Sequence, residues 1–244
     1  LKQRGMNVTV LHLMDRIMER QLDGRASRML RQSIEQKGIN IITEANTEAL
    51  IGKKGHVSQV RLKDDTVLDA DLVVFAVGIR PNIALAQSAG LRCNRGVLVN
   101  DTMQTFDPSI YAVGECIEHR NQTFGLVEPL WGQAFVCATH LAEHGSLTFK
   151  SPTVPTQLKV SGVDVFSAGN IEPKEDYEDI ILNDEKRQIY KRIIIQKDKV
   201  IGAVLFGDTE DGMWYAELIA DQTPIVSFRN KLLFGKDFAM KKAG

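Results

Sequence analysis

The chain has 244 residues, of which 43% are hydrophobic and 25% charged, and these proportions exclude a disordered, collagen-like or coiled-coil protein. The 30 Lys and Arg residues nearly balance the 31 Asp and Glu residues, so net charge gives no reason to expect nucleic acid or a membrane as partner. The 3 cysteines include no CxxC pair, and no run of about 18 apolar residues occurs. We therefore expect no metal site, no membrane span and a cytoplasmic location.

The first residues predict strand and helix in alternation. Residues 1–5 have the pattern of a helix end that Gly5 closes, and an apolar strand follows at 8–11. Apolar side chains three and four residues apart predict a helix over 23–37, after which residues 39–42 return to extended structure. Because the chain opens on the end of a helix, we expect it to be part of a longer protein.

An apolar run at 72–77 resembles a core strand. It ends in Gly78, and its lack of polar alternation predicts a strand buried on both faces of a parallel sheet. A polar turn between apolar segments at 57–62 and 67–68 predicts a small hairpin before it. Strand, helix, strand, hairpin and buried strand together indicate an α/β fold.

The middle of the chain continues with short strands predicted at 97–99 and 110–113 and a helix over 129–142. Ser, Thr and Pro are then frequent over 146–155, which predicts a domain boundary. Beyond it, the sequence favours strands and one helix, over about 211–221. The strands predicted there are 157–160, 164–167, 188–195 and 200–206.

The most specific motif is the predicted strand 110–113 with Gly114 and Glu115 at its carboxyl end. A ligand binds in the crevice beyond the carboxyl ends of parallel strands, and a glycine there allows the backbone to approach it closely. Glu115 places a carboxylate where it can accept hydrogen bonds from a polyol. The pattern therefore predicts a binding site at this strand end.

This motif resembles the second flavin-binding motif of the FAD-dependent pyridine nucleotide-disulfide oxidoreductases, whose acidic residue holds the ribityl chain of FAD. The resemblance implies that role for Glu115, which stands where the family usually has Asp. Residues 72–82 are similar to the family's strand and Gly-x-Arg-Pro segment in the NAD domain. Gly78, Arg80 and Pro81 are then expected to line the nucleotide side of the site.

Residues 125–137 resemble the family's helix whose N-terminal amides approach the flavin, which implies that Leu130 and Trp131 lie closest to it. Residues 18–23, 114–116 and 118–131 are together similar to the flavoprotein portion of NAD(P)H-dependent nitrite reductase large subunits. The resemblance implies an oxidoreductase that passes electrons from NAD(P)H through FAD to an electron-acceptor domain or a small redox protein. The hydride step itself needs no side-chain acid, and the sequence identifies no particular catalytic residue.

Two alternatives stay open: an electron-transfer reductase for rubredoxin or ferredoxin, and a docking or dimerisation module without catalysis. A homodimer is a further expectation. Neither G-x-G-x-x-G loop of the family occurs in the chain, and those loops supply backbone donors to the cofactor pyrophosphates. We therefore expect this stretch alone to bind neither cofactor appreciably and to be inactive.

His12 follows the strand 8–11, at the place where an acid would bind the adenosine ribose of NADH, and Arg16 is nearby. Both NADH and NADPH fit this position. His140 and His144 lie four residues apart without a third metal ligand.

The predicted fold is α/β, with incomplete doubly wound, disulfide-reductase-like FAD- and NAD-binding domains and a C-terminal α+β interface domain. The expected boundaries are 1–98 for the NAD(P)-binding domain, which lacks its first strand and glycine loop, 99–150 for the C-terminal part of the FAD-binding domain, and 151–244 for the interface domain.

Overall fold

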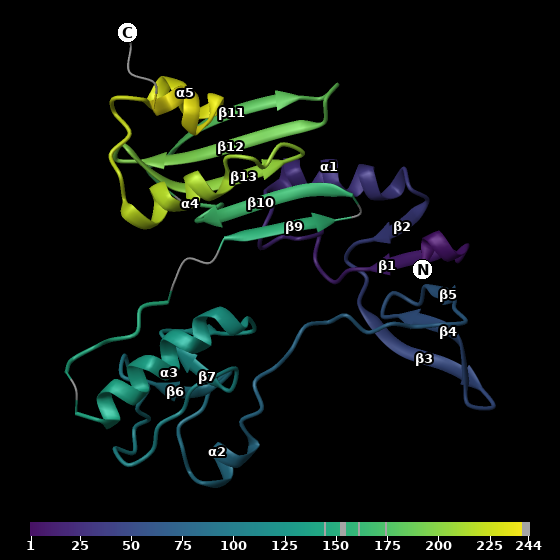
Figure 1. Ribbon diagram of the computed structural model, residues 1–244. Helices are drawn as coiled ribbons and strands as arrows, with labels where there is room; N and C mark the ends of the chain where they lie inside the picture. Colours follow the sequence, from purple (N-terminus) through teal and green to yellow (C-terminus); the bar gives the residue numbers. More distant parts are fainter. Residues whose placement is uncertain (144, 152–154, 161, 174, 241–244) are drawn as a thin grey trace. The chain divides into compact units, whose positions relative to one another are not determined.

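The computed structural model divides the chain into two compact units (Figure 1). It describes residues 1–143, 145–151, 155–160, 162–173 and 175–240. The first unit combines Leu1–Val73 with Thr153–Gly244, and the second is Val74–Pro152. The start of the chain thus packs with its end. The three predicted domains stay a prediction, and residues 152–154 of the predicted boundary lie outside the described residues.

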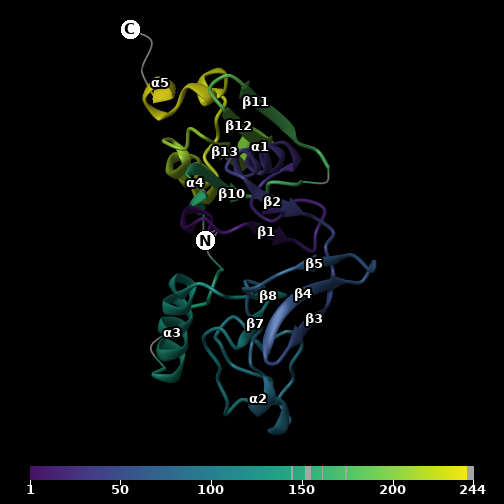
Figure 2. The same ribbon diagram turned by 90° about the vertical axis from the view of Figure 1, so that its right-hand side faces the viewer.

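The N-terminal part of the first unit holds a two-stranded parallel sheet and a helix. Strands β1 (Val8–Leu11) and β2 (Ile39–Ile42) pair in parallel, and helix α1 (Gly24–Glu35) connects them, as the sequence predicts. A short 3-10 helix, η1 (Lys2–Arg4), precedes β1 and ends at Gly5, whose φ of 81° suits glycine. The predicted hairpin is part of a three-stranded antiparallel meander (Figure 2). Its strands are β3 (Thr47–Lys53), β4 (His56–Leu62) and β5 (Val67–Asp69).

The C-terminal part of the first unit is a five-stranded antiparallel sheet with strand order β11-β12-β13-β10-β9. Its strands are β9 (Thr156–Val160), β10 (Val163–Gly169), β11 (Glu178–Asp184), β12 (Ile189–Gln196) and β13 (Lys199–Phe206). Helix α4 (Gly212–Asp221), the 3-10 helix η2 (Arg229–Phe234) and helix α5 (Lys236–Met240) follow. The four strands and the helix predicted here are confirmed, and β11 is an additional strand.

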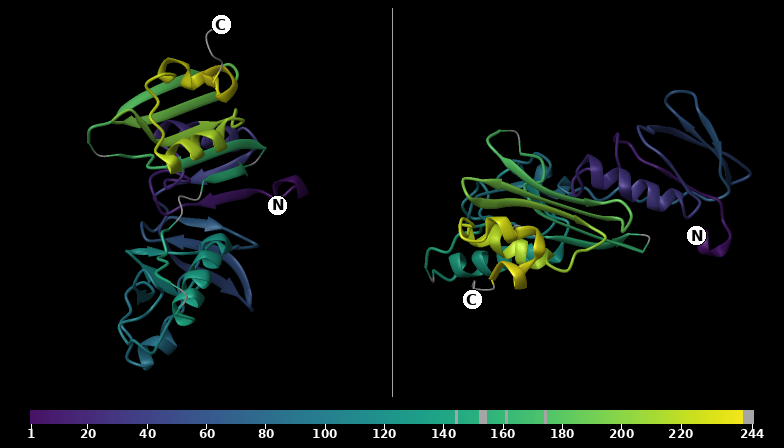
Figure 3. Two further views of the ribbon diagram at one scale, coloured as in Figure 1. Left: turned by 60° about the vertical axis from the view of Figure 1, so that its left-hand side comes forward. Right: turned by 90° about the horizontal axis from the view of Figure 1, so that it is seen from above.

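Helices α1 and α4 cover opposite faces of this five-stranded sheet (Figure 3). Alternate residues of a strand point to opposite faces. On β13, Val204 and Phe206 accordingly pack with α1, whereas Ala203 and Leu205 pack with α4. Trp214, on α4, is only 5% exposed. Both faces of the sheet are therefore needed for the core of the first unit.

The second unit is built around helix α3 (Val127–Leu141), close to its predicted bounds. The other elements are helix α2 (Ala84–Ser88) and a small sheet of β6 (Val97–Val99), β7 (Ile117–His119) and β8 (Gln122–Thr123). The core consists mainly of apolar side chains from α3, β7 and the loops. Its buried members are Met103, Ile117, Phe124, Val136 and Phe149.

Two predicted strands do not form. Residues 72–77 make no strand pairing in the described structure, and Val77 is 87% exposed rather than buried. A buried parallel strand needs hydrogen-bonding neighbours, and the parallel sheet of β1 and β2 has only two strands. Residues 110–113 form only one isolated bridge, from Tyr111 to Gln104. The amide of Ala112 donates to the carbonyl of Met103 at 3.1 Å, so this segment pairs with its own preceding turn instead of a sheet.

Candidate functional site

The loop with Gly114 and Glu115 is attached to helix α3 through a buried glutamine. Gly114 has a φ of 102°, and its amide donates to the Oε1 atom of Gln133 at 2.8 Å. Gln133 is fully buried, and its Nε2 atom has no hydrogen-bond partner. Glu115 is exposed. The loop therefore exposes the Glu115 carboxylate to solvent, while the Gly114 backbone is bound to Gln133 of α3.

The sequence analysis did not identify Gln133, although a polar residue on the apolar face of a predicted helix indicates a specific contact. The buried residues of α3 are Pro129, Gln133 and Val136, which lie on one face of the helix. A polar amide on an apolar helix face requires a hydrogen-bond partner. That rule points to a specific backbone contact, which the structure identifies as Gly114.

The first turn of α3 lacks a side-chain cap, since the N-cap residue is Leu126. In this turn the N–H groups of Val127 and Glu128 are therefore available to an acceptor outside the helix, whereas Pro129 has no N–H. The two predicted contact residues differ in position: Leu130 packs against the core of the second unit, whereas Trp131 is 74% exposed. Val127 and Phe135, one turn before and after Trp131, are also exposed. This face of α3 is apolar and open.

The predicted Gly78-Ile79-Arg80-Pro81 segment lies beside the start of α3. A Cβ atom on Gly125 would be 3.3 Å from Cδ1 of Ile79, which places the two segments in contact. Gly78 has a φ of 77°, and Gly78 and Arg80 are exposed while Pro81 is half-buried. The structure thus brings this segment to Gly125, just before α3, and the Gly114 loop to Gln133 within α3.

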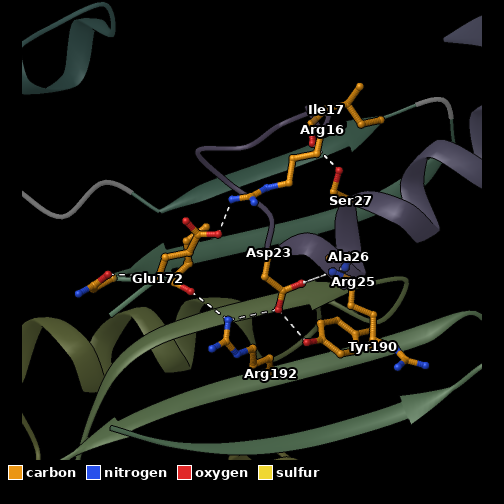
Figure 4. Close-up of polar contacts among 11 residues, drawn as sticks. Arg16, Ile17, Asp23, Arg25, Ala26, Ser27, Glu172, Tyr190 and Arg192 are labelled. Carbon is orange, nitrogen blue, oxygen red and sulfur yellow. Dashed lines mark hydrogen bonds and ion pairs between the residues drawn. The ribbon is translucent and has the colours of Figure 1, made fainter. Parts of the chain in front are cut away.

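His12 belongs to the first unit, at the carboxyl end of β1. Its amide donates to the carbonyl of Ile42 at 2.9 Å, so it lies where the two parallel strands end. The ring Nε2 atom is 3.1 Å from Oε2 of Glu19. Arg16, in the same loop, forms an ion pair with Glu172 from the C-terminal part of the unit (Figure 4).

The loop after β1 ends in a buried polar network that sequence reasoning did not predict (Figure 4). Oδ1 of Asp23 accepts from the amides of Arg25 and Ala26 and so caps α1, while Oδ2 accepts from the Tyr190 hydroxyl at 2.7 Å. Arg192 Nη1 lies 3.4 Å from the same Oδ2. Burial, and secondarily the Asp23 carboxylate, raise the pKa of Tyr190. The hydroxyl therefore remains a donor, and the network joins α1 to β12.

The second unit contains a further set of polar contacts around the buried side chains of Glu118 and His119. The carboxylate of Glu118 accepts from the amide of Arg95 at 2.8 Å and from the amide of Gly96 at 3.2 Å. Burial alone would raise the pKa of Glu118, but these amides lower it below its usual range. Arg120 and His119 hydrogen-bond to Asp101 and lower its pKa to about 2. These contacts connect loops next to the small sheet.

The three cysteines form no disulfide. Cys93, Cys116 and Cys137 are free and half-buried, and burial raises the pKa of Cys93 and Cys137. The described His, Cys, Asp and Glu side chains do not gather into a group able to hold a metal ion. His144 lies outside the described residues. Among the described helices, none is long and apolar enough to cross a membrane.

The second unit has features that fit a flavin. A Cβ atom on Gly114 would meet no atom within 4 Å, so the backbone there is open to a ligand. The Glu115 carboxylate is exposed beside it, and α3 offers uncapped amides and an apolar face with Trp131. Hydroxyl groups suit the carboxylate, and a partly apolar ring suits the helix face.

Comparisons with known proteins find family models and relatives that match most of the chain. Residues 1–134 match the family described as pyridine nucleotide-disulphide oxidoreductase, and residues 155–223 match the rubredoxin NAD+ reductase C-terminal domain. The chain is 46% identical over 221 residues to a nitrite reductase [NAD(P)H] of Bacillus subtilis (strain 168), covering 91% of this chain and 27% of the relative. It is 39% identical to an assimilatory nitrate reductase electron transfer subunit of the same organism, covering 96% of this chain and 30% of the relative.

Solved structures give the same fold. A FAD-dependent pyridine nucleotide-disulphide oxidoreductase from Desulfovibrio vulgaris matches with a TM-score of 0.75 and 27% identity, over 94% of this chain and 62% of that one. The predicted α/β, disulfide-reductase-like fold class is confirmed. The chain spans less than a third of the length of the two relatives from Bacillus subtilis. With more than half of its residues matching one family, the chain belongs to the pyridine nucleotide-disulphide oxidoreductases.

Proposed function

We propose that this chain is part of an NAD(P)H-dependent oxidoreductase of the nitrite reductase type, which passes electrons from NAD(P)H through FAD to an acceptor. The observation that carries the proposal is the 46% identity to a nitrite reductase [NAD(P)H] over 91% of the chain. FAD and NAD(P)H are the cofactors of the family to which the chain belongs.

The chain's own residues would bind and orient these cofactors. Glu115 would accept hydrogen bonds from the ribityl hydroxyls, and Gly114 would let the backbone come close to them. The uncapped amides of α3 would face the pyrimidine end of the ring, where they favour negative charge. When bound, FAD supplies the hydride acceptor. The sequence resemblance assigns Gly78, Arg80 and Pro81 of the second unit to nucleotide binding, and it separately assigns His12 of the first unit to the adenosine ribose.

The acceptor is proposed to be a further domain of the same protein or a small redox protein. The relative described as an assimilatory nitrate reductase electron transfer subunit supports a role in electron transfer. A homodimer and a cytoplasmic location remain predictions from the sequence.

The proposal is tested in the full-length protein that contains this chain. We expect stoichiometric FAD in the purified protein and NADH- or NADPH-dependent reduction of ferricyanide and of nitrite. Glu115→Ala should weaken FAD binding roughly 10- to 150-fold, because a charge-assisted hydrogen bond contributes about 1.5–3 kcal/mol. Glu143→Ala, on an exposed residue just after α3, is the matched control and should leave FAD affinity unchanged. A full-length protein without flavin, or equal effects of the two substitutions, would contradict the proposal.

A second candidate is a reductase for rubredoxin or ferredoxin, favoured by the match of residues 155–223 to the rubredoxin NAD+ reductase C-terminal domain. The two candidates differ in the final acceptor. Reduction of added rubredoxin or ferredoxin, with no reduction of nitrite, would favour the second.

A further inference from the structure

The loop after β1 contains side chains that could bind a phosphate on the adenosine ribose, and two of them, His12 and Arg16, already contact carboxylates. His12 Nε2 lies 3.1 Å from Glu19, and their side chains are 29% and 26% exposed. Arg16 pairs with Glu172, and their side chains are 27% and 53% exposed. Three of these four side chains are thus mostly shielded from solvent, whereas that of Glu172 is about half exposed.

Hydrogen bonds hold the backbone at Glu172 and at the residue before it (Figure 4). Its amide donates to Oδ1 of Asn170 at 3.2 Å, and the carbonyl of the preceding residue, Ile171, accepts from Arg192 Nη1 at 3.0 Å. The same guanidinium contacts Asp23 at the end of the β1 loop. The backbone that carries Glu172 is therefore held beside the loop by the same network that caps α1, and its carboxylate contacts Arg16.

NADPH differs from NADH by a phosphate on the 2′-hydroxyl of the adenosine ribose. A site selects NADH when a carboxylate accepts from that hydroxyl, and it accepts NADPH when an arginine is free for the phosphate. The strand-end position holds His12 rather than an acid. Glu19 brings a carboxylate to that histidine from seven residues further along the chain.

We propose that Glu19 and Glu172 make this nucleotide site selective for NADH over NADPH. Glu19 supplies the carboxylate for the 2′-hydroxyl, and Glu172 keeps Arg16 from a 2′-phosphate. A 2′-phosphate would meet two carboxylates and no unpaired Arg16, so the site discriminates by repulsion as well as attraction. The inference rests on the proposed function, and it assigns a role in nucleotide choice to a residue of the C-terminal part of the unit.

The test uses the full-length protein with ferricyanide as acceptor. We expect the wild type to have a higher kcat/KM for NADH than for NADPH. In Glu19→Gln and Glu172→Gln, and most in the double variant, the ratio of kcat/KM for NADPH to that for NADH should rise at least about 10-fold, equivalent to about 1.4 kcal/mol. Glu185→Gln is the matched control, because Glu185 pairs with Arg25 on the same unit, and it should leave the ratio unchanged.

A binding measurement separates nucleotide choice from folding and catalysis. 2′,5′-ADP carries the distinguishing phosphate and 5′-ADP does not, so Glu172→Gln should tighten competition by 2′,5′-ADP about 10-fold and leave 5′-ADP unchanged. The exposed side chain of Glu172 makes this variant the least disruptive to folding.

Each outcome decides between the hypotheses. Wild-type preference for NADPH, or a double variant with an unchanged ratio, would overturn the inference. Failure to oxidise either nucleotide would instead overturn the proposed function.

Discussion

Replacing Asp23 with Ala should destabilise the first unit far more than removing the tyrosine hydroxyl that it accepts from. Loss of the helix cap costs about 1 kcal/mol. The Tyr190 hydroxyl, in a side chain only 2% exposed, would lose its acceptor, which costs a further 1–3 kcal/mol or so. Arg192 keeps its contact with Asp179 at 2.9 Å, so it adds little. The expected loss in free energy of unfolding is about 3 kcal/mol.

Tyr190→Phe removes the hydroxyl without leaving a buried donor unpaired, because Asp23 still caps α1 and contacts Arg192. We expect a loss of about 1 kcal/mol. The double variant should lose about 2 kcal/mol, which is less than the sum of the single effects. The difference of about 2 kcal/mol measures the coupling between the two side chains.

Urea unfolding of the 244-residue chain can measure these changes. The chain has 2 tryptophans, and Trp214 is buried in the first unit, so its fluorescence in a Trp131→Phe background reports on that unit. Glu185→Ala removes a surface ion pair on the same unit and should change stability by less than about 1 kcal/mol. Additive effects of the two network substitutions would refute the reasoning, since they would show that the carboxylate does not serve the tyrosine.

Two further outcomes are expected. Arg120 and His119 lower the pKa of Asp101 from 3.8 to about 2. The stabilisation of the second unit by the Asp101 carboxylate should therefore be complete above about pH 4 and lost as pH falls toward 2. Amide hydrogen exchange of β7 should show this loss, and Asp101→Asn should remove its pH dependence. A Cβ atom at Gly212 would lie 2.6 Å from the Phe166 ring, so Gly212→Ala should cost about 1–3 kcal/mol in the fluorescence assay, and an unchanged midpoint would show that the ring can move aside.

The elements that sequence predicted correctly depend on local patterns. The strands at β10, β12 and β13 and the helices α1, α3 and α4 have apolar spacing that burial requires wherever the element packs. The prediction of a strand at 72–77 was wrong because a strand also needs hydrogen-bonded neighbours, and an apolar run does not specify which segment it pairs with. Strand β11 was missed because polar residues at both of its ends obscure the three apolar residues at its centre.

The candidate site shows the same limit. Gly114 and Glu115 belong to a contiguous motif, so the sequence could name them, and their roles stay predictions. Asp23 and Tyr190 are 167 residues apart, and no spacing rule connects them. Such pairs become visible only when the fold brings the two segments together.

The division of the first unit between the two ends of the chain has a consequence during synthesis. The buried face of α1 packs on β10, β12 and β13, and the last of these ends at Phe206, about 170 residues after α1. At roughly 5–20 residues per second, the ribosome needs on the order of 10–35 s to make the covering strands. During that interval Leu22, Ala26 and Leu30 have no native partner surface on the C-terminal sheet. A nascent chain of this kind is therefore a substrate for chaperones that bind exposed apolar segments, and slower translation before β13 would lengthen its exposure.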